Sequence, residues 1–299
     1  MKLFFIVNPI SGGVDKEPFL KKAKKLCDFY GIEFMIFKTT GKNDEDEVLR
    51  SIEEFKPDKI ASVGGDGTTL FCATALLNSS YPMGIIPLGS ANGMAKELFV
   101  NPTPIEALKD IIMSEIIEGL DMVLIDNKHY TMHIGDVGIN ASIVDAYEKD
   151  KNRGMATYAK YFMEELKRLK PFKVTVKTKD NTVTTNVFMA AICNARKYGT
   201  GVLLNDRGNL MDGKFEIVLV EKINISSLLK AGLSAFKDEF FDSQSSQVIS
   251  TNKAEIIFEE PRLLQLDGEV IGYYKNIKVE ALESAVKFIT HRGNTHLAE

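Results

Sequence analysis

The chain has 299 residues and a mass of 33.3 kDa, long enough for two domains that each bury a core of their own. Hydrophobic residues make up 44% and charged residues 26% of it, which is typical of a folded globular protein and excludes a disordered or fibrous one. With 37 Lys and Arg against 41 Asp and Glu, the net charge of −4 makes nucleic acid an unexpected partner. Three scattered cysteines without a CxxC spacing indicate neither a disulfide framework nor a thiolate zinc site.

Short apolar runs alternate with helical patterns along the first third of the chain. Strands are predicted at residues 3–7, 32–37, 60–63 and 83–88, and helices at 16–30, 44–55, 68–77 and 91–98. This alternation indicates parallel strands joined by right-handed crossovers, and therefore a doubly wound α/β sheet. Ligands of such a sheet bind at the carboxyl ends of its strands.

After about residue 118 the pattern changes to hairpins. Strand pairs are predicted within 122–134 and 173–193, further strands at 215–220, 254–258, 262–266 and 276–282, and helices at 155–169 and about 225–236. We therefore expect a mostly antiparallel β-sandwich as the second domain. The predicted domains are an α/β domain at 1–118, with the C-terminal tail at 286–299 as a candidate to pack back on it, and a β-sandwich at 119–285.

A glycine-rich segment, GGDGTT at 64–69, lies between a predicted strand and a predicted helix. Three glycines within four positions let backbone amides approach an anion, and the helix N-terminus adds partial positive charge and free N–H groups. The segment therefore predicts a phosphate-binding loop. A carboxylate beside phosphates needs a compensating cation, so Asp66 indicates Mg²⁺. The alternative is a glycine-rich turn in which Asp66 only caps a helix.

Two further loops follow the predicted strands at 3–7 and 83–88. Their sequences, NPISGG at 8–13 and PLGSANGMA at 87–95, combine small residues with Ser and Asn side chains that can bond phosphate or ribose. Each loop alone is explained equally well by a tight turn. Because the carboxyl ends of parallel strands meet at one edge of a sheet, the three loops together favour a nucleotide site there.

In their order and spacing, NPISGG, GGDGTT and PLGSANGMA resemble the catalytic domain shared by diacylglycerol kinases, sphingosine and ceramide kinases and bacterial soluble lipid kinases. The later segments NLMDGK at 209–214 and LDGE at 266–269 resemble the structural magnesium loop and the DGE motif of that family, so the resemblance covers essentially the whole chain. It implies phosphoryl transfer from ATP, with Mg²⁺, to a lipid hydroxyl. It also implies that ATP lies in a cleft between an α/β domain and a β-sandwich.

The resemblance implies roles for individual residues. Glu269 matches the proton acceptor of the family and Asp66 is its partner in the catalytic set, with Asp267 as a structural neighbour. Considered without the resemblance, the sequence at 267–269 favours an exposed β-turn with two acidic residues. The positions that match nucleotide contacts are Asn8, Thr39 (with Thr40 as the alternative register), Gly64, Gly65, Asp66, Gly67, Thr68, Ser90 and Asn92. The metal loop matches at Asn209, Asp212 and Lys214, where Asp212 offers a carboxylate and the other two residues offer backbone carbonyls.

One position departs from the family pattern. Members with a PLGTAND segment carry Asp where this chain has Gly93, whereas sphingosine and ceramide kinases have a small residue there. Diacylglycerol is the expected acceptor, and a long-chain base or ceramide stays open beside it. The sequence is also compatible with an NAD kinase, which shares GGDGT, and with a non-catalytic nucleotide or lipid sensor.

Location and assembly are predicted only broadly. The first apolar run ends at residue 7, well short of the roughly 20 residues of a membrane span, and no signal-peptide pattern is present. We therefore expect a cytoplasmic protein that contacts membranes at most peripherally. Pairing of exposed sheet edges leaves a homodimer open.

Overall fold

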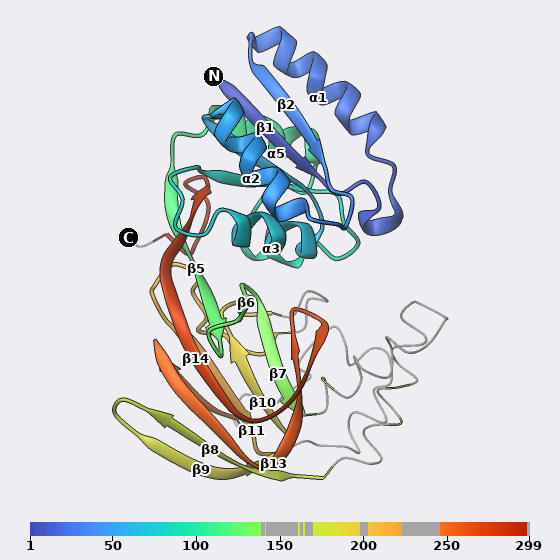
Figure 1. Cartoon of the computed structure of the whole chain (residues 1–299). Coiled ribbons are helices and arrows are strands. Elements are labelled where there is room, and N and C mark those ends of the chain that lie inside the picture. Colours follow the sequence, from blue (N-terminus) through green and yellow to red (C-terminus); the bar gives the residue numbers. More distant parts are fainter. Residues whose placement is uncertain are drawn as a thin grey trace. The chain divides into compact units, whose positions relative to one another are not determined.

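The computed structural model describes residues 1–138, 170–197, 203–222 and 246–297, together with residues 141, 161 and 164. The helices predicted at 155–169, apart from those single residues, and at 225–236 lie outside this part of the chain. Two compact units are present, one formed by Met1–Asp121 with Glu283–Glu299 and the other by Met122–Leu282 (Figure 1). The division falls close to the sequence boundaries at 118 and 286.

The first unit is built on a parallel sheet with the strand order β4-β3-β1-β2. The central strand β1 (Lys2–Val7) pairs with β2 (Glu33–Lys38) on one side and with β3 (Lys59–Gly64) on the other, and β4 (Met83–Pro87) pairs with β3. Because the chain leaves β1 in both directions, the switch point of the topology lies between β1 and β3. The carboxyl ends of these two strands meet there, where the N–H of Asn8 donates to Val63 O at 3.1 Å.

Helices cover both faces of this sheet. They are α1 (Glu17–Tyr30), α2 (Asp44–Phe55), α3 (Asp66–Ala75), α4 (Gly93–Glu97) and α5 (Pro104–Met113) (Figure 1). Side chains of α1 and α5 share one core cluster with Phe5 of β1, whereas Phe55 of α2 packs at 6.1 Å between ring centroids from Phe4, which points to the opposite face. The predicted doubly wound α/β fold is confirmed. No helix of the described chain is both long and apolar enough to cross a membrane.

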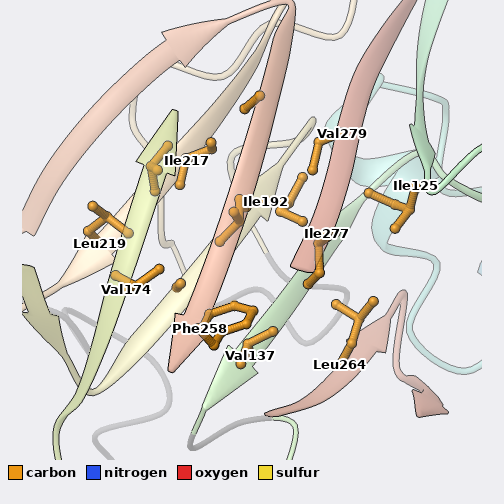
Figure 2. Packing of buried hydrophobic residues seen from close by; sticks show 14 of the residues in the cluster. Ile125, Val137, Val174, Ile192, Ile217, Leu219, Phe258, Leu264, Ile277 and Val279 are labelled. Carbon is orange, nitrogen blue, oxygen red and sulfur yellow. The ribbon is translucent and has the colours of Figure 1, made fainter. Parts of the chain in front are cut away.

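The second unit is antiparallel throughout its described strands. Two of the strands, β5 and β14, continue into the first unit. The strands that lie wholly or partly in the second unit are β5 (Ile117–Ile125), β6 (His129–Thr131), β7 (Ile134–Gly138), β8 (Phe172–Thr178), β9 (Thr182–Val187), β10 (Met189–Cys193), β11 (Phe215–Val220), β12 (Ser246–Thr251), β13 (Lys253–Leu266) and β14 (Glu269–Ile289). The main order is β12-β11-β10-β7-β13-β14, and β13 also pairs with β8, which pairs with β9. Figure 2 shows Val137, Ile192, Phe258 and Ile277, from four different strands, in the shared apolar interior. The predicted β-sandwich is confirmed.

Several strand boundaries differ from the sequence prediction, among them those of β14, which runs from Glu269 to Ile289 where a strand at 276–282 is predicted. The predicted strands at 254–258 and 262–266 form the single strand β13, whose pairing with β14 shifts register between Ile257 and Arg262. The polar residues of that interruption are exposed, so the strand continues through an irregularity instead of ending. Phe188 divides the predicted second strand of the 173–193 hairpin into β9 and β10. No strand was predicted at Ser246–Thr251, which form β12.

Candidate active site

Three glycines bring the loops after β1, β3 and β4 into contact in the first unit. A Cβ added to Gly89 would lie 2.3 Å from the Cα of Gly65, and a Cβ added to Gly12 would lie 2.8 Å from the carbonyl carbon of Gly89. Both contacts are with backbone, which cannot swing aside as a side chain does. The approach of NPISGG, GGDGTT and PLGSANGMA to one another therefore requires glycine at these positions.

The phosphate-binding loop predicted at 64–68 leads directly into α3. Gly65 is the N-cap of this ten-residue helix, and no side chain caps it. The N–H of Thr69 donates to Gly65 O at 3.0 Å, and the N–H groups of the preceding turn have no carbonyl to bond within the helix. Gly67 is exposed at this end. The arrangement offers several N–H groups and a positive helix end to an anion.

Thr68, another residue of the predicted phosphate-binding loop, turns its side chain inward. Its side chain is buried against Gly64, where an added Cβ would lie 2.3 Å from Thr68 Oγ1. Within the described part of the chain, this hydroxyl has no hydrogen-bond partner. Gly64 is thus needed to make room for Thr68.

Asp66 links two of the three loops. Its Oδ1 accepts the N–H of Met94 at 2.8 Å, in the first turn of α4. Asp66 therefore caps a helix, as the alternative interpretation predicts. The helix it caps is α4, through Met94, which lies 28 positions further along the chain, whereas Asp66 itself is the first residue of α3. The side chain is half-buried, and its second oxygen remains chemically suited to a hard cation.

Two asparagines of the predicted nucleotide set hold their own loops. Asn92 has a left-handed backbone, with φ of 52°, and its Oδ1 accepts the N–H of Gly89 at 2.8 Å while its Nδ2 donates to Gly89 O at 3.1 Å. Asn8 Oδ1 accepts the N–H of Ile10 at 3.2 Å. These hydrogen bonds support a role for both asparagines in holding their loops. The hydroxyl-bearing residue Ser90 is exposed beside them.

The turn after β2 is organised by Asp44. Its carboxylate accepts the N–H of Thr40 at 2.8 Å, the hydroxyl of Thr40 at 2.9 Å and the N–H of Gly41 at 2.7 Å. Burial raises the pKa of Asp44, but these hydrogen bonds outweigh burial and lower the pKa overall. Thr39 stays outside this network, with its hydroxyl 3.5 Å from Val7 O. Thr39 is therefore freer than Thr40 to contact a ligand.

Lys16 is a residue of this edge that the sequence did not single out. It is 3% exposed, and its Nζ donates to Ser11 O at 2.5 Å and Val14 O at 2.8 Å. Burial lowers the pKa of its ammonium group, and the neighbouring Asp15 opposes this effect. Lys16 therefore fixes the fold of the loop after β1. A single lysine before a helix carries no sequence signal for such a role.

Glu269 lies in the second unit, directly after the turn between β13 and β14. Asp267 and Gly268 form this β13–β14 turn with φ of 51° and 89°, the conformation of a tight hairpin. Asp267 accepts the hydroxyl of Thr131 at 2.6 Å, and the N–H groups of residues 132–134 at 3.2–3.3 Å. Burial raises the pKa of Asp267, while His133 and these hydrogen bonds oppose the rise. The Glu269 side chain itself is exposed.

The predicted metal loop forms a compact turn in the same unit. Asn209 Oδ1 accepts the N–H of Met211 at 3.1 Å, and Asp212 Oδ1 accepts the N–H of Lys214 at 3.0 Å. Asp212 is exposed. In the ranges that the structure describes, no three His, Cys, Asp or Glu side chains form a metal-binding group. The donors of this loop are thus one carboxylate and backbone carbonyls, which suit a hard cation that keeps several waters.

Both units match known family models. Residues 2–125 match the diacylglycerol kinase catalytic domain, and residues 135–290 match the YegS C-terminal NAD kinase beta sandwich-like domain. The chain belongs to the diacylglycerol kinase family of lipid kinases. The resemblance predicted from the five motifs is confirmed.

Relatives in this family are distant in sequence and similar in length. A diacylglycerol kinase of Bacillus subtilis (strain 168) is 23% identical over 270 residues, which cover 89% of each chain. A diacylglycerol kinase of Mycobacterium tuberculosis (strain H37Rv) is 24% identical over 268 residues, covering 87% of this chain and 85% of that protein. A crystal structure of a diacylglycerol kinase from Bacillus anthracis has a TM-score of 0.74 at 20% identity, with 98% of both chains covered, and shows the same fold.

Proposed function

We propose that this lipid kinase transfers the γ-phosphate of ATP to the hydroxyl group of diacylglycerol. The observation that carries the proposal is the contact of three glycine-rich loops at the switch-point edge of the first unit, beside the free N–H groups of α3. The names of the two relatives from Bacillus subtilis and Mycobacterium tuberculosis favour diacylglycerol as the acceptor. A cytoplasmic location and peripheral contact with the membrane that holds the lipid belong to the same proposal.

In the first unit, the backbone is the main ligand for ATP. The N–H groups at 66–68 would bind phosphate oxygens, and Gly65 and Gly67 let them approach without a side chain in the way. Ser90 and Thr39 are the side-chain hydroxyls of the predicted set that remain available, whereas Asn8 and Asn92 would act by holding their loops.

Magnesium, when bound with ATP, supplies positive charge that neutralises the phosphates during transfer. In the first unit, Asp66 would hold it through the oxygen that Met94 does not engage. In the second unit, the Asp212 carboxylate and the carbonyls of Asn209 and Lys214 would hold a structural ion.

Glu269 would accept the proton of the lipid hydroxyl. The hydroxyl oxygen forms a new bond to the γ-phosphorus, the bond from that phosphorus to the bridging oxygen of ADP breaks, and the proton passes to the Glu269 carboxylate. An exposed carboxylate next to a tight turn suits this role, because it is open to a substrate while its backbone is fixed.

The test is phosphate transfer from γ-labelled ATP with Mg²⁺ to diacylglycerol, ceramide, a long-chain base, phosphatidylglycerol and NAD in parallel detergent-dispersed reactions. We expect label in diacylglycerol. Label only in ceramide or the long-chain base would make that lipid the acceptor in place of diacylglycerol. Gly93 at the start of α4 favours this outcome. Label only in NAD would overturn the proposal, and ATP binding without any transfer would favour a sensor.

Glu269→Gln tests the proton acceptor within the same assay. The amide keeps the size of the side chain but accepts no proton, so we expect kcat to fall by about 10²- to 10⁴-fold while the affinity for ATP is unchanged. Glu260→Gln, at an exposed glutamate of β13, is the matched control and should keep wild-type turnover. Full turnover in Glu269→Gln would assign the proton to another acceptor.

A further inference from the structure

A chain of hydrogen bonds runs from the β13–β14 turn into the interior of the second unit. The N–H of Gly268 donates to Oε1 of Gln265 at 2.8 Å. Nε2 of Gln265 donates to Oδ2 of Asp136, and Oδ1 of Asp136 accepts the N–H of Ala141 at 3.0 Å. Asp136 has 0% and Gln265 1% of its surface exposed, whereas Glu269, the residue after Gly268, is exposed. The exposed carboxylate therefore follows a backbone amide that is anchored in the interior.

The donors and acceptors of this chain allow one arrangement. A backbone N–H only donates, so Gln265 turns its carbonyl oxygen toward Gly268, which leaves its amide N–H₂ group to donate to Asp136. The antiparallel pairing of β7 with β13 sets Gln265 directly opposite Asp136. The sheet register thus brings the two side chains together, and their hydrogen bonds fix the position of the turn.

A buried carboxylate in a strand is unfavourable unless its hydrogen bonds compensate for lost hydration. The neighbours of these residues along β7 and β13, Val137, Leu264 and Leu266, are apolar and buried, so packing alone does not call for a polar pair here. The β13–β14 turn is in addition held on its other side, where Asp267 accepts N–H groups at 132–134. Both residues of the turn are therefore anchored.

We propose that Asp136 and Gln265 are positioning residues that fix the β13–β14 turn, and through it the Glu269 carboxylate, for accepting the proton of the lipid hydroxyl. This inference rests on the proposed role of Glu269. Misplacing a reacting group by about 1 Å lowers the rate by as much as 10²-fold, which gives such an anchor a kinetic purpose.

An exchange of polarity between the two side chains tests the proposal. Asp136→Asn places an N–H₂ group against a donor, either Gln265 or Ala141, so one bond of the chain is lost. Gln265→Glu sets a second carboxylate against Asp136. In the double variant the new amide donates to the new carboxylate, whose other oxygen still accepts the N–H of Gly268. We expect each single variant to lose about 10- to 100-fold in kcat with KM for ATP unchanged, and the double variant to regain most of it.

Amide exchange of Gly268, followed by NMR, reports on the chain without any substrate. We expect faster exchange in Asp136→Asn and restored protection in the double variant. Ser250→Ala is the control, because it removes a hydroxyl bonded to the buried Glu216 and does not touch the turn. It should lower the melting temperature while kcat and Gly268 exchange stay at wild-type values. If Asp136→Asn does not fold, Gln265→Glu and the double variant provide the same comparison of loss and rescue.

The outcomes separate this inference from the proposed function. Faster Gly268 exchange with wild-type kcat would reduce Asp136 and Gln265 to a structural role and overturn the inference. Unchanged exchange in Asp136→Asn would overturn it as well, because the chain would not hold the turn. A wild-type protein that labels no lipid would overturn the proposed function, and the positioning role with it. Loss of kcat in the single variants and rescue in the double variant would support both.

Discussion

The two units hold their predicted functional residues by different physical means. In the first unit backbone meets backbone, and Gly65 and Gly89 are close because neither has a side chain. In the second unit the β13–β14 turn is held by side-chain hydrogen bonds, those of the half-buried Asp267 and the buried Gln265. The first arrangement presents N–H groups to an anion, and the second places one exposed carboxylate. Added volume should therefore damage the first unit most, and lost hydrogen bonds the second.

Gly89→Ala is the change with the largest expected effect. The new methyl group would lie 2.3 Å from the Cα and 2.9 Å from the N of Gly65, so the backbone of one loop must move. We expect a loss of about 1–3 kcal/mol in the free energy of unfolding and at least a tenfold loss of ATP affinity. Thermal unfolding and calorimetric titration with ATP measure the two effects.

Gly67→Ala is the control for stability in the same loop. A Cβ at Gly67 would meet nothing within 4 Å, and its φ is not positive. Because alanine has less conformational freedom than glycine in the unfolded chain, we expect an unchanged or slightly higher melting temperature. Equal destabilisation by the two substitutions would contradict the close contact of Gly89 with Gly65.

Asp267→Asn tests the hydrogen-bonded turn of the second unit. Asparagine tolerates the φ of 51° at this position, so the backbone conformation can be kept. One acceptor oxygen becomes an N–H₂ group that faces the donors of Thr131 and residues 132–134. We expect a loss of about 1–3 kcal/mol in the free energy of unfolding by urea, with ATP affinity unchanged.

Asp180→Asn, at an exposed position between β8 and β9, is the matched control and should leave the free energy of unfolding within about 0.5 kcal/mol of wild type. If Asp267→Asn were equally harmless, the side-chain anchor would not determine the stability of this turn, and the contrast between the two units would be lost.

Local patterns were sufficient to predict the first unit apart from α5, where no helix was predicted from the sequence. Its strands, helices and loops follow from short apolar runs and glycines that are adjacent in sequence, and their meeting at one edge follows from parallel pairing. The bond from Asp66 to Met94 could not be predicted, because an acid after two glycines is equally compatible with a cation or a helix cap. Which carboxylate oxygen of Asp66 stays available for a cation depends on where α4 begins.

The anchors of the second unit escaped prediction for a different reason. Gln265 lies between Leu264 and Leu266, and alternation in a strand normally assigns such a polar residue to the solvent face. Asp136 is likewise a single polar residue between Gly135 and Val137 in β7. Both residues are buried nevertheless, so period-two reasoning fails where neither face of a strand is exposed.

Glu216 gives a smaller effect that depends on pH, of a kind that contacts between glycines cannot produce. This buried carboxyl group of β11 accepts the Ser250 hydroxyl at 2.9 Å and the Asn205 amide at 2.8 Å. Burial raises its pKa, and the two hydrogen bonds oppose the rise only in part. Folding thus favours the protonated form.

The sign of the pH dependence follows from this raised pKa. The contribution of Glu216 to stability is complete below its unfolded pKa of about 4.3 and is lost as pH rises through the higher pKa of the folded state. Glu216→Gln has no charge to bury, and its amide can accept from Asn205 and donate to the Ser250 hydroxyl. We expect the melting temperature of the variant, relative to wild type, to increase from about pH 5 to about pH 8. A difference that stays constant over this range would mean that Glu216 titrates alike in the folded and unfolded chain, and that its hydrogen bonds fully compensate for burial.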